Sequence, residues 1–142
     1  IEVSILDAND NKPIFERTVY KSTISESLPV GSFVLTVRAT DVDLAENGAV
    51  RYAISPQSLI SVPNLRSYFR LNATSGIMTT NSVLDRESVA MFRLVPCRRD
   101  QGIPVALTSS ATVDITVIDI NDEIPRFDRD VYSLSVLENR VV

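Results

Sequence analysis

Apolar and polar residues alternate with a period of two through most of the central part of the chain, a pattern typical of half-buried β-strands. The clearest alternating segments are 33–39, 50–54, 92–94 and 111–117. Turn-forming residues such as Asn47-Gly48 separate them. No stretch shows a sustained helical period. About seven short strands in about 105 residues predict an all-β fold, a β-sandwich.

One alternating segment and one irregular segment carry specific expectations. In segment 33–39 the apolar residues, Phe33 among them, are expected to form one strand, with Thr36 and Arg38 facing away. The segment 55–68 shows no clear period, and we interpret it as a surface loop.

The run around Pro96 is also irregular. Proline cannot donate to a strand ladder, so Pro96 predicts an edge strand or a bulge. Arg98 falls where a side chain should face inward, and a register shift at the bulge would turn Cys97 inward instead. A lone cysteine in a strand is expected to be a small buried apolar residue.

A segment near the start of the chain is repeated 112 residues later. Asp7–Pro13 is similar to Asp119–Pro125, and ten of 24 positions are identical between 7–30 and 119–142. This similarity predicts a complete module at 14–118 between linkers at 7–13 and 119–125. Residues 1–6 are then the last strand of a preceding repeat, and 126–142 the start of the next.

Composition excludes several classes of function. The 142 residues include 18 acidic against 14 basic side chains, a net charge of −4 that argues against nucleic-acid binding. Histidine is absent, so the commonest acid–base catalyst is missing. The single cysteine cannot form an internal disulfide. No apolar run reaches the ~18 residues of a membrane span.

Many of the acids lie in short clusters near predicted strand ends. Asp41 and Asp43, like Asp85 and Glu87, stand two positions apart, on one side of an extended chain. Two carboxylates ~5 Å apart at an effective dielectric of ~20 repel by roughly 3 kcal/mol, so such clusters need a counter-charge. All candidate ligand atoms are oxygens, which favours Ca²⁺.

Two other uses of these acids fail. Asp7-x-Asn9-x-Asn11 opens like an EF-hand loop, but Lys12 stands where that loop needs glycine and Thr18 where it needs glutamate. Asp85 and Glu87 on one strand do not flank a sugar bond from opposite faces, as a glycosidase pair must. An enzymatic role is therefore not expected.

The motifs together resemble those of the cadherin family. Asp7–Pro13 looks like the interdomain linker DxNDNxP, and four further acidic motifs follow in the family's order: Ser25-Glu26-Ser27, Asp41-Val42-Asp43, Leu84-Asp85-Arg86-Glu87 and Arg99-Asp100-Gln101. The resemblance covers the whole chain. It implies a seven-stranded Greek-key sandwich of the immunoglobulin-like kind, with Ca²⁺-binding linkers at both ends.

The resemblance also implies a set of ligands at each end. The entrance end would hold an ion on the side chains of Asn9, Asp41, Asp43 and Asp100 and the carbonyls of Asn11 and Asn47; Asp7 and Asp10 would hold ions shared with a preceding domain. The exit end would hold one ion on Glu26, Asp85, Glu87 and Asp122, and another on Glu26, Glu87, Asp119, Asp122 and the carbonyl of Ile120. Asn121 would serve a third ion, and Glu138 is the counterpart of Glu26 in the next repeat. Glu123 departs from the linker pattern, where a second asparagine is usual, but the family uses the backbone carbonyl there.

These resemblances predict the function of a Ca²⁺-dependent cell–cell adhesion repeat, with a non-adhesive spacer as the alternative. A third possibility is a ligand-binding sandwich in which calcium is incidental. The expected partners are Ca²⁺, neighbouring repeats of the same chain and another cadherin on an apposed cell. The expected location is the extracellular side of the plasma membrane, as part of a larger single-pass protein.

Two smaller features complete the prediction. The chain has no tryptophan, whereas the outermost repeats of type I and type II cadherins insert one. It therefore looks like an internal repeat of a long cadherin such as the protocadherin, Fat or Dachsous types. Asn72-Ala73-Thr74 is an N-glycosylation sequon.

Overall fold

The structure is a computed structural model of the 142-residue chain. It describes residues 3, 7–56, 58, 64–100, 106–121, 129, 131–133 and 135. For residues 46 and 98–100 only the backbone is described.

Short strands dominate the described part of the chain, so the predicted all-β fold is confirmed. The strands are β1 (Ile14–Phe15), β2 (Val19–Ser25), β3 (Phe33–Thr36), β4 (Ala39–Thr40), β5 (Val50–Ile54), β6 (Phe69–Leu71), β7 (Ile77–Thr80), β8 (Met91–Leu94), β9 (Pro96–Asp100), β10 (Thr108–Ser110) and β11 (Thr112–Ile118). Two helical turns, α1 (Ala45–Gly48) and α3 (Leu65–Tyr68), interrupt them. The pairs β1/β2, β3/β4, β8/β9 and β10/β11 are each separated by three residues or fewer, which leaves seven extended segments.

The strands form two layers. One layer contains the orders β2-β11-β8 and β10-β9-β5, which are continuous because β8 leads into β9 and β10 into β11. The other contains β3-β7-β6, and β4, which follows β3, pairs with β1. β2 lies parallel to β11 from Val19–Thr112 to Ser25–Ile118, whereas the other pairs are antiparallel. Several neighbours, such as β2 and β11 or β3 and β7, are not consecutive in sequence, as in a Greek key.

Alternate residues of both layers meet in one apolar core. Phe69 and Phe92 come from opposite layers and pack edge to face, with ring centroids 4.9 Å apart. Burying a side chain of this kind stabilises a fold by roughly 1.5–3 kcal/mol. The core residues are Tyr20, Ile24, Val34, Leu35, Val37, Ala39, Tyr52, Ile54, Leu65, Phe69, Met78, Leu84, Phe92, Leu94, Ala111, Val113, Ile115 and Val117.

The irregularity near Pro96 takes a different form from the one expected. Pro96 is the first residue of β9, which is the central strand between β10 and β5 and not an edge. The first residue of a strand is a position that proline tolerates. Cys97 does not face the core: it lies opposite the exposed Ala53 and shares its face, half-buried, with its Sγ 3.4 Å from the Ala53 carbonyl oxygen.

Two other expectations were wrong. Phe33 is 61% exposed, because the pairing of β3 with β7 shifts between Phe33 and Leu35 and so turns both Val34 and Leu35 inward. The segment 55–68 is not simply a surface loop. Leu65 in α3 is fully buried, and the hydroxyl of the buried Ser58 accepts a bond from the Val95 amide.

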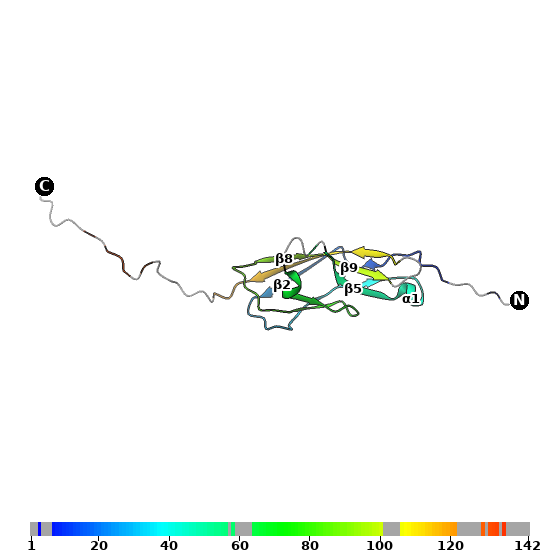
Figure 1. The fold of residues 1–142 in the computed structure, drawn as a ribbon, viewed down its shortest axis with the longest axis horizontal. Coiled ribbons are helices and arrows are strands. Elements are labelled where there is room, and N and C mark those ends of the chain that lie inside the picture. Colours follow the sequence, from blue (N-terminus) through cyan, green and yellow to red (C-terminus); the bar gives the residue numbers. More distant parts are fainter. Residues whose placement is uncertain are drawn as a thin grey trace.

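The sandwich is elongated, and its two ends carry different segments (Figure 1). α1 lies at the end where the described residues 7–13 enter, and β11 finishes at the opposite end. Strands occupy the chain between Ile14 and Ile118, inside the bounds predicted for the complete module. The strand expected at 1–6 falls almost entirely outside the described residues.

Candidate calcium sites at the two ends of the sandwich

A buried carboxylate organises the exit end, where β2 and β11 finish. Glu26, directly after β2, is only 4% exposed. One of its carboxylate oxygens accepts a hydrogen bond from the Arg86 amide at 2.7 Å, and the other accepts one from the Ile120 amide at 2.9 Å. A buried carboxylate needs such partners. Glu26 therefore holds the segment around Arg86 and the start of the second linker together.

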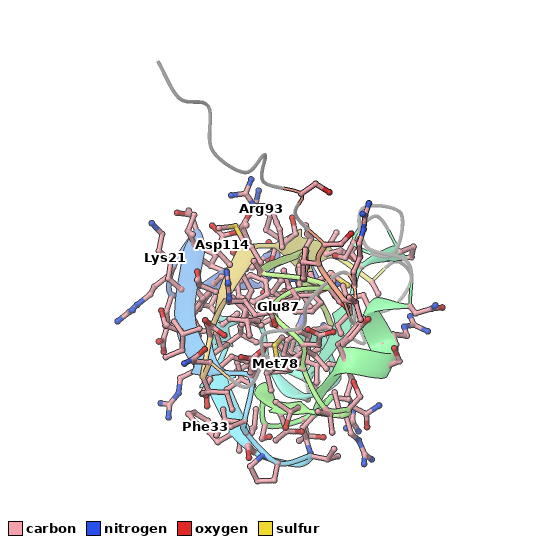
Figure 2. All side chains as sticks on the ribbon, turned by 90° about the vertical axis from the view of Figure 1, so that its left-hand side faces the viewer. Lys21, Phe33, Met78, Glu87, Arg93 and Asp114 are labelled. Carbon is pink, nitrogen blue, oxygen red and sulfur yellow. The ribbon has the colours of Figure 1, made fainter. Side chains whose placement is uncertain are left out.

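Two further acids lie beside Glu26. Carboxylate oxygens of Glu26, Glu87 and Asp119 all lie within 4.8 Å of one another. Desolvation, with the charges of Glu26 and Asp119, raises the pKa of Glu87, whereas the Glu87 amide and Arg86 act in the opposite direction. We call these three residues the exit triad. Figure 2 views the sandwich from this end, with Glu87 labelled.

One basic side chain accompanies the exit triad. The Nη2 atom of Arg86 lies 3.3 Å from a Glu87 oxygen and 4.0 Å from an Asp119 oxygen. Nε of Arg86 is buried and has no hydrogen-bond partner among the described residues. One guanidinium thus contacts two of the three carboxylates, and negative charge remains in excess. The sequence analysis did not assign this role to Arg86, although its place between Asp85 and Glu87 was a possible signal.

Asp85 has a different environment from the exit triad. Its oxygens accept bonds from the Ser88 hydroxyl at 2.6 Å and the Glu87 amide at 3.0 Å. These bonds, the Ser88 hydroxyl first, lower the pKa of Asp85. Asp85 therefore shapes the turn that presents Glu87, and its own role as a ligand stays a prediction.

The second linker turns sharply where it leaves β11. Asn121 has a positive φ of 49°, and its amide donates to Asp119 at 3.2 Å. Ile120, whose carbonyl is a predicted ligand, is joined to Glu26 through its amide. The predicted ligands Asp122 and Glu138 lie outside the described residues.

The entrance end brings linker residues onto the loop after β4. Both the amide and the side chain of Asn11 donate to Asp43. Asp7 accepts bonds from the Leu44 amide and the Asn47 side chain, each at 2.9 Å. The structure thus joins two segments about 35 residues apart in the chain, through N–H groups of Asn11 and Asn47 and not through their carbonyls, which stay predicted ligands.

The remaining entrance residues divide into three groups. Asp41 accepts a bond from the Asp43 amide at 3.1 Å, and its second oxygen is buried without a hydrogen-bond partner among the described residues. Asp10 accepts a bond from the Asn11 side chain at 2.7 Å, and Asn9 beside it is half-buried. Asp100 pairs with Val50 through its backbone, and its side chain is not described.

A glycine permits this arrangement. A Cβ on Gly48 would lie 2.1 Å from the carbonyl oxygen of Asp43, a contact that no other residue could make. Gly48 ends α1 and lets this turn lie against the Asp43 backbone, which places Asn47 within reach of Asp7. The sequence analysis predicted the Asn47 carbonyl as a ligand, but it interpreted Gly48 only as part of a turn.

The donor sets at both ends fit a hard cation. The groups brought together are carboxylate, amide and main-chain oxygens, the ligands that Ca²⁺ prefers in sets of about 6–8. The buried, unpartnered oxygen of Asp41 and the excess negative charge of the exit triad both favour a positive ion.

The fold and these two acidic ends define an immunoglobulin-like β-sandwich module, and comparison with known proteins assigns its family. The cadherin domain profile matches residues 20–118, more than half of the chain. The chain belongs to the cadherin family, as the motifs predicted.

Similar sequences occur in long cadherins. The chain is 40% identical over 139 residues to the Caenorhabditis elegans cadherin EGF LAG seven-pass G-type receptor fmi-1, which matches 98% of this chain and 5% of that protein. It is 42% identical over 139 residues to human protocadherin Fat 4, with 98% of this chain and 3% of that protein covered. The chain thus spans a small part of the relatives it matches.

Solved structures show the same fold. The mouse clustered PcdhgC3 EC1-3 structure superposes with a TM-score of 0.76 at 30% identity, covering 80% of this chain and 35% of that one. The mouse cadherin-23 EC22-24 structure gives 0.73 at 30% identity, covering 82% and 35%. Cadherin repeats are parts of adhesion receptors and not enzymes, which confirms the expectation of no catalytic role. Within the described residues, no helix is long and apolar enough to cross a membrane.

Proposed function

We propose that this chain is a Ca²⁺-dependent repeat of a cell-adhesion ectodomain, stiffened by Ca²⁺ at both ends. The observation that carries the proposal is the exit triad, in which Glu26, Glu87 and Asp119 lie within 4.8 Å of one another. The proposed location is the extracellular side of the plasma membrane, within a larger single-pass protein. Family membership supports the adhesion role.

The residues act by joining segments that otherwise repel. Bound Ca²⁺ would supply the positive charge that the acidic ends lack. At the exit end, Glu26, Glu87 and Asp119 would then fix the second linker to the sandwich, with Asp85, Ile120, Asn121 and Asp122 as further proposed ligands. At the entrance end, Asp41 and Asp43 would fix the first linker through Asn9 and Asn11, with Asn47 and Asp100. Asp7 and Asp10 would reach a preceding repeat, and Glu138 would serve the next one.

The proposed mechanism depends on calcium concentration. Extracellular modules commonly bind Ca²⁺ with dissociation constants of about 10⁻⁴–10⁻³ M, so their sites are filled outside cells and empty inside. With filled sites, tandem repeats form a stiff rod. With empty sites, the remaining charge repulsion loosens each linker.

Thermal unfolding of the full 142-residue chain tests this proposal. In millimolar Ca²⁺ the melting temperature should exceed that in chelator by several degrees, because ligands that bind only the folded state stabilise it. Asp41→Ala and Glu87→Ala should each reduce this difference, one from each end. Glu16→Ala removes an exposed acid outside the proposed sites and should leave it unchanged. Equal melting temperatures with and without Ca²⁺ would show that the acids are only solvated surface.

A second candidate function is a spacer that makes no contact with a partner. The same sandwich and the same sites would serve it, so stability measurements cannot separate it from adhesion. Aggregation of beads coated with the full ectodomain distinguishes the two. Substitutions on the exposed surface of this repeat should reduce the aggregation if the repeat contacts a partner, and should leave it unchanged if the repeat is a spacer. The sequon at Asn72 stays a proposed glycosylation site: the residue is exposed, and its side-chain oxygen accepts bonds from the Thr74 and Ser75 amides.

A further inference from the structure

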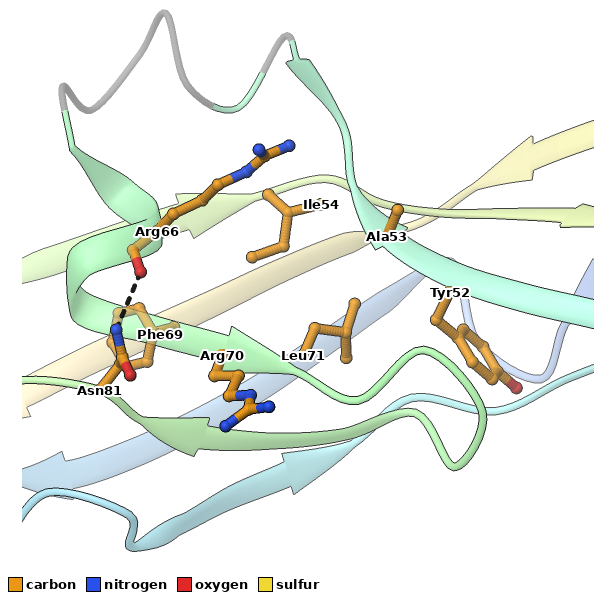
Figure 3. Close-up of a pocket in the computed structure, with 8 residues that line it drawn as sticks. All are labelled: Tyr52, Ala53, Ile54, Arg66, Phe69, Arg70, Leu71 and Asn81. Carbon is orange, nitrogen blue, oxygen red and sulfur yellow. Dashed lines mark hydrogen bonds between the residues drawn. The ribbon is translucent and has the colours of Figure 1, made fainter.

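A groove lies where the two layers of the sandwich present free edges to each other. β5 is the edge of one layer and β6 the edge of the other. The groove has a volume of about 460 Å³ and is lined by Tyr52, Ala53, Ile54, Arg66, Phe69, Arg70, Leu71 and Asn81 (Figure 3). We call it the edge groove. It shares no residue with either candidate calcium site.

The two edges leave main-chain groups unused by the strand ladders. The amide of Tyr52 donates across the gap to the Ala73 carbonyl at 2.8 Å. The main-chain N–H and C=O groups of alternate residues in β5 therefore point toward β6. Ile54 is the next residue of β5 with this orientation. Just after β6, the amide of Asn72 donates to the Ile77 carbonyl within the same sheet. The N–H and C=O groups of the preceding residue, Leu71, therefore point in the opposite direction, toward β5. The groove is thus lined by N–H and C=O groups of Ile54 and Leu71 that the strand pairings among the described residues do not use.

The groove also carries positive charge. Arg66 on α3 and Arg70 on β6 both line it, both are exposed, and no acidic residue is among the lining residues. Neither guanidinium forms an ion pair within the described part of the chain. The groove therefore presents two positive charges without a counter-charge among the described residues, on a chain of net charge −4. It favours a ligand that brings carboxylates.

The floor of the groove is apolar and firmly packed. Phe69 is 1% exposed and packs on Phe92, and Ile54 is 7% exposed. Asn81 fixes α3 in place, because its side chain donates to the carbonyls of Arg66 and Ser67 at 3.2 and 3.3 Å. The groove is therefore preformed, which reduces the entropic cost of binding.

We infer that the edge groove binds an extended acidic peptide segment of a partner protein. Its carboxylates would pair with Arg66 and Arg70, since arginine forks bind carboxylates in bidentate geometry. Its main chain would bond to the unused groups at Ile54 or Leu71, as in strand addition, and an apolar side chain would cover the floor. A polyanionic glycan would use the two arginines but neither the main-chain groups nor the apolar floor, so a peptide fits better.

Fluorescence anisotropy with a labelled peptide tests this inference on the full 142-residue chain. The probe is a seven-residue peptide of alternating glutamate and valine, measured in millimolar Ca²⁺. The double variant Arg66→Glu/Arg70→Glu should weaken binding at least about tenfold, since two charge-assisted contacts become repulsive. Arg17→Glu/Arg38→Glu makes a charge change of the same size at exposed sites outside the groove, and should leave binding unchanged. Both groove arginines are exposed, so an unaltered melting temperature would show that the double variant still folds.

Three further outcomes decide between ligands. The same peptide with methylated amides on alternate residues should bind at least about tenfold more weakly, because it cannot donate to an edge strand. Equal binding of the methylated peptide, or no binding of the parent peptide, would overturn the inference. A heparin fragment that displaces the peptide and binds more tightly would identify a glycan site instead. The inference is independent of the calcium proposal, because repeating the titration in chelator tests the groove without filled calcium sites.

Discussion

The two ends of the sandwich hold their acids in different ways. At the exit end the exit triad is built around a buried carboxylate, which main-chain amides hold from both sides, and a guanidinium faces the acids. At the entrance end none of the described acid side chains is fully buried, and the neutral side chains of Asn11 and Asn47 donate to Asp43 and Asp7. At the exit end a guanidinium therefore contacts the acids, whereas at the entrance end neutral side-chain amides donate hydrogen bonds to them.

This difference separates two roles that a ligand residue can have. Glu26 stabilises the fold even without a bound ion, because its removal leaves two amides without their acceptor. Asp43 contacts a linker residue at the surface, where water can replace it. We therefore expect the exit end to influence stability with and without Ca²⁺, and the entrance end mainly with it.

The largest expected effect is that of Glu26→Ala. Each buried donor left unsatisfied costs roughly 1–3 kcal/mol, so the free energy of unfolding in chelator should fall by about 2 kcal/mol or more. For a domain of this size the melting temperature should drop by roughly 8 °C. Thermal unfolding in chelator measures this drop.

Asp43→Ala is the matched variant at the entrance end. In chelator it should lower the melting temperature by less than a third as much as Glu26→Ala, whereas in Ca²⁺ both variants should lose stabilisation. Equal losses in chelator would show that the two ends do not differ in the way the hydrogen bonds suggest.

Arg86→Ala should have the next largest effect, and in two directions. Removal of the guanidinium leaves the exit triad without its counter-charge, so the melting temperature in chelator should fall. The same change removes a competitor for the carboxylates, so Ca²⁺ affinity should rise by about threefold, the range of an exposed ion pair. Calorimetric titration measures the affinity, and Arg17→Ala is the control. Weaker Ca²⁺ binding by Arg86→Ala would mean that this arginine positions the acids rather than competing for them.

Much of this comparison was accessible from the sequence. Alternation predicted the strands, and the resemblance to the cadherin motifs predicted which acids would meet at each end. Glu26 and Asp119 are more than 90 residues apart in the chain, yet the order of the motifs placed both at the exit end, and the structure brings them together. This placement came from the resemblance to the family, whose motifs are recognisable in the sequence.

The parts that could not be predicted depend on register and local geometry. Phe33 and Cys97 follow the alternation, but a shifted pairing and a strand that starts at Pro96 decide which way they face. The side chain and the main-chain groups of Leu71 point toward different parts of the fold. The alternation within a single strand therefore does not reveal the edge groove. The counter-charge role of Arg86 requires distances across the fold.

A smaller effect should appear in the pH dependence of the exit end. The pKa of Glu87 is raised above 4.5, so the folded protein binds a proton there more readily than the unfolded chain does. In Ca²⁺-free buffer, stability should therefore rise slightly as pH falls from neutral through the raised pKa toward 4.5. In Ca²⁺ the trend should reverse, because protons compete with the ion.

Melting curves at several pH values, with and without Ca²⁺, measure these opposite slopes. Glu87→Gln should flatten the Ca²⁺-free slope, since it removes the titrating group. The pKa of Asp85 is lowered instead, so its contribution is present above about 3.8 and is lost only at more acidic pH. Parallel slopes with and without Ca²⁺ would contradict a calcium-binding role for Glu87.

The smallest effect is expected from a pair that belongs to neither end. On the outer face of one layer, Asp114 lies between Lys21 and Arg93, and Arg93 binds it through two hydrogen bonds of 2.7 and 3.2 Å (Figure 2). Arg93 lowers the pKa of Asp114, but Arg93 is 67% exposed, and exposed pairs contribute little. Arg93→Ala should lower the melting temperature by a few degrees at most, by the same amount with and without Ca²⁺. Because the lowered pKa stabilises the fold above about 3.8, this small loss should vanish as pH falls below that value. A loss that depends on Ca²⁺ would mean that the ends are coupled through the sheet and cannot be treated as separate sites.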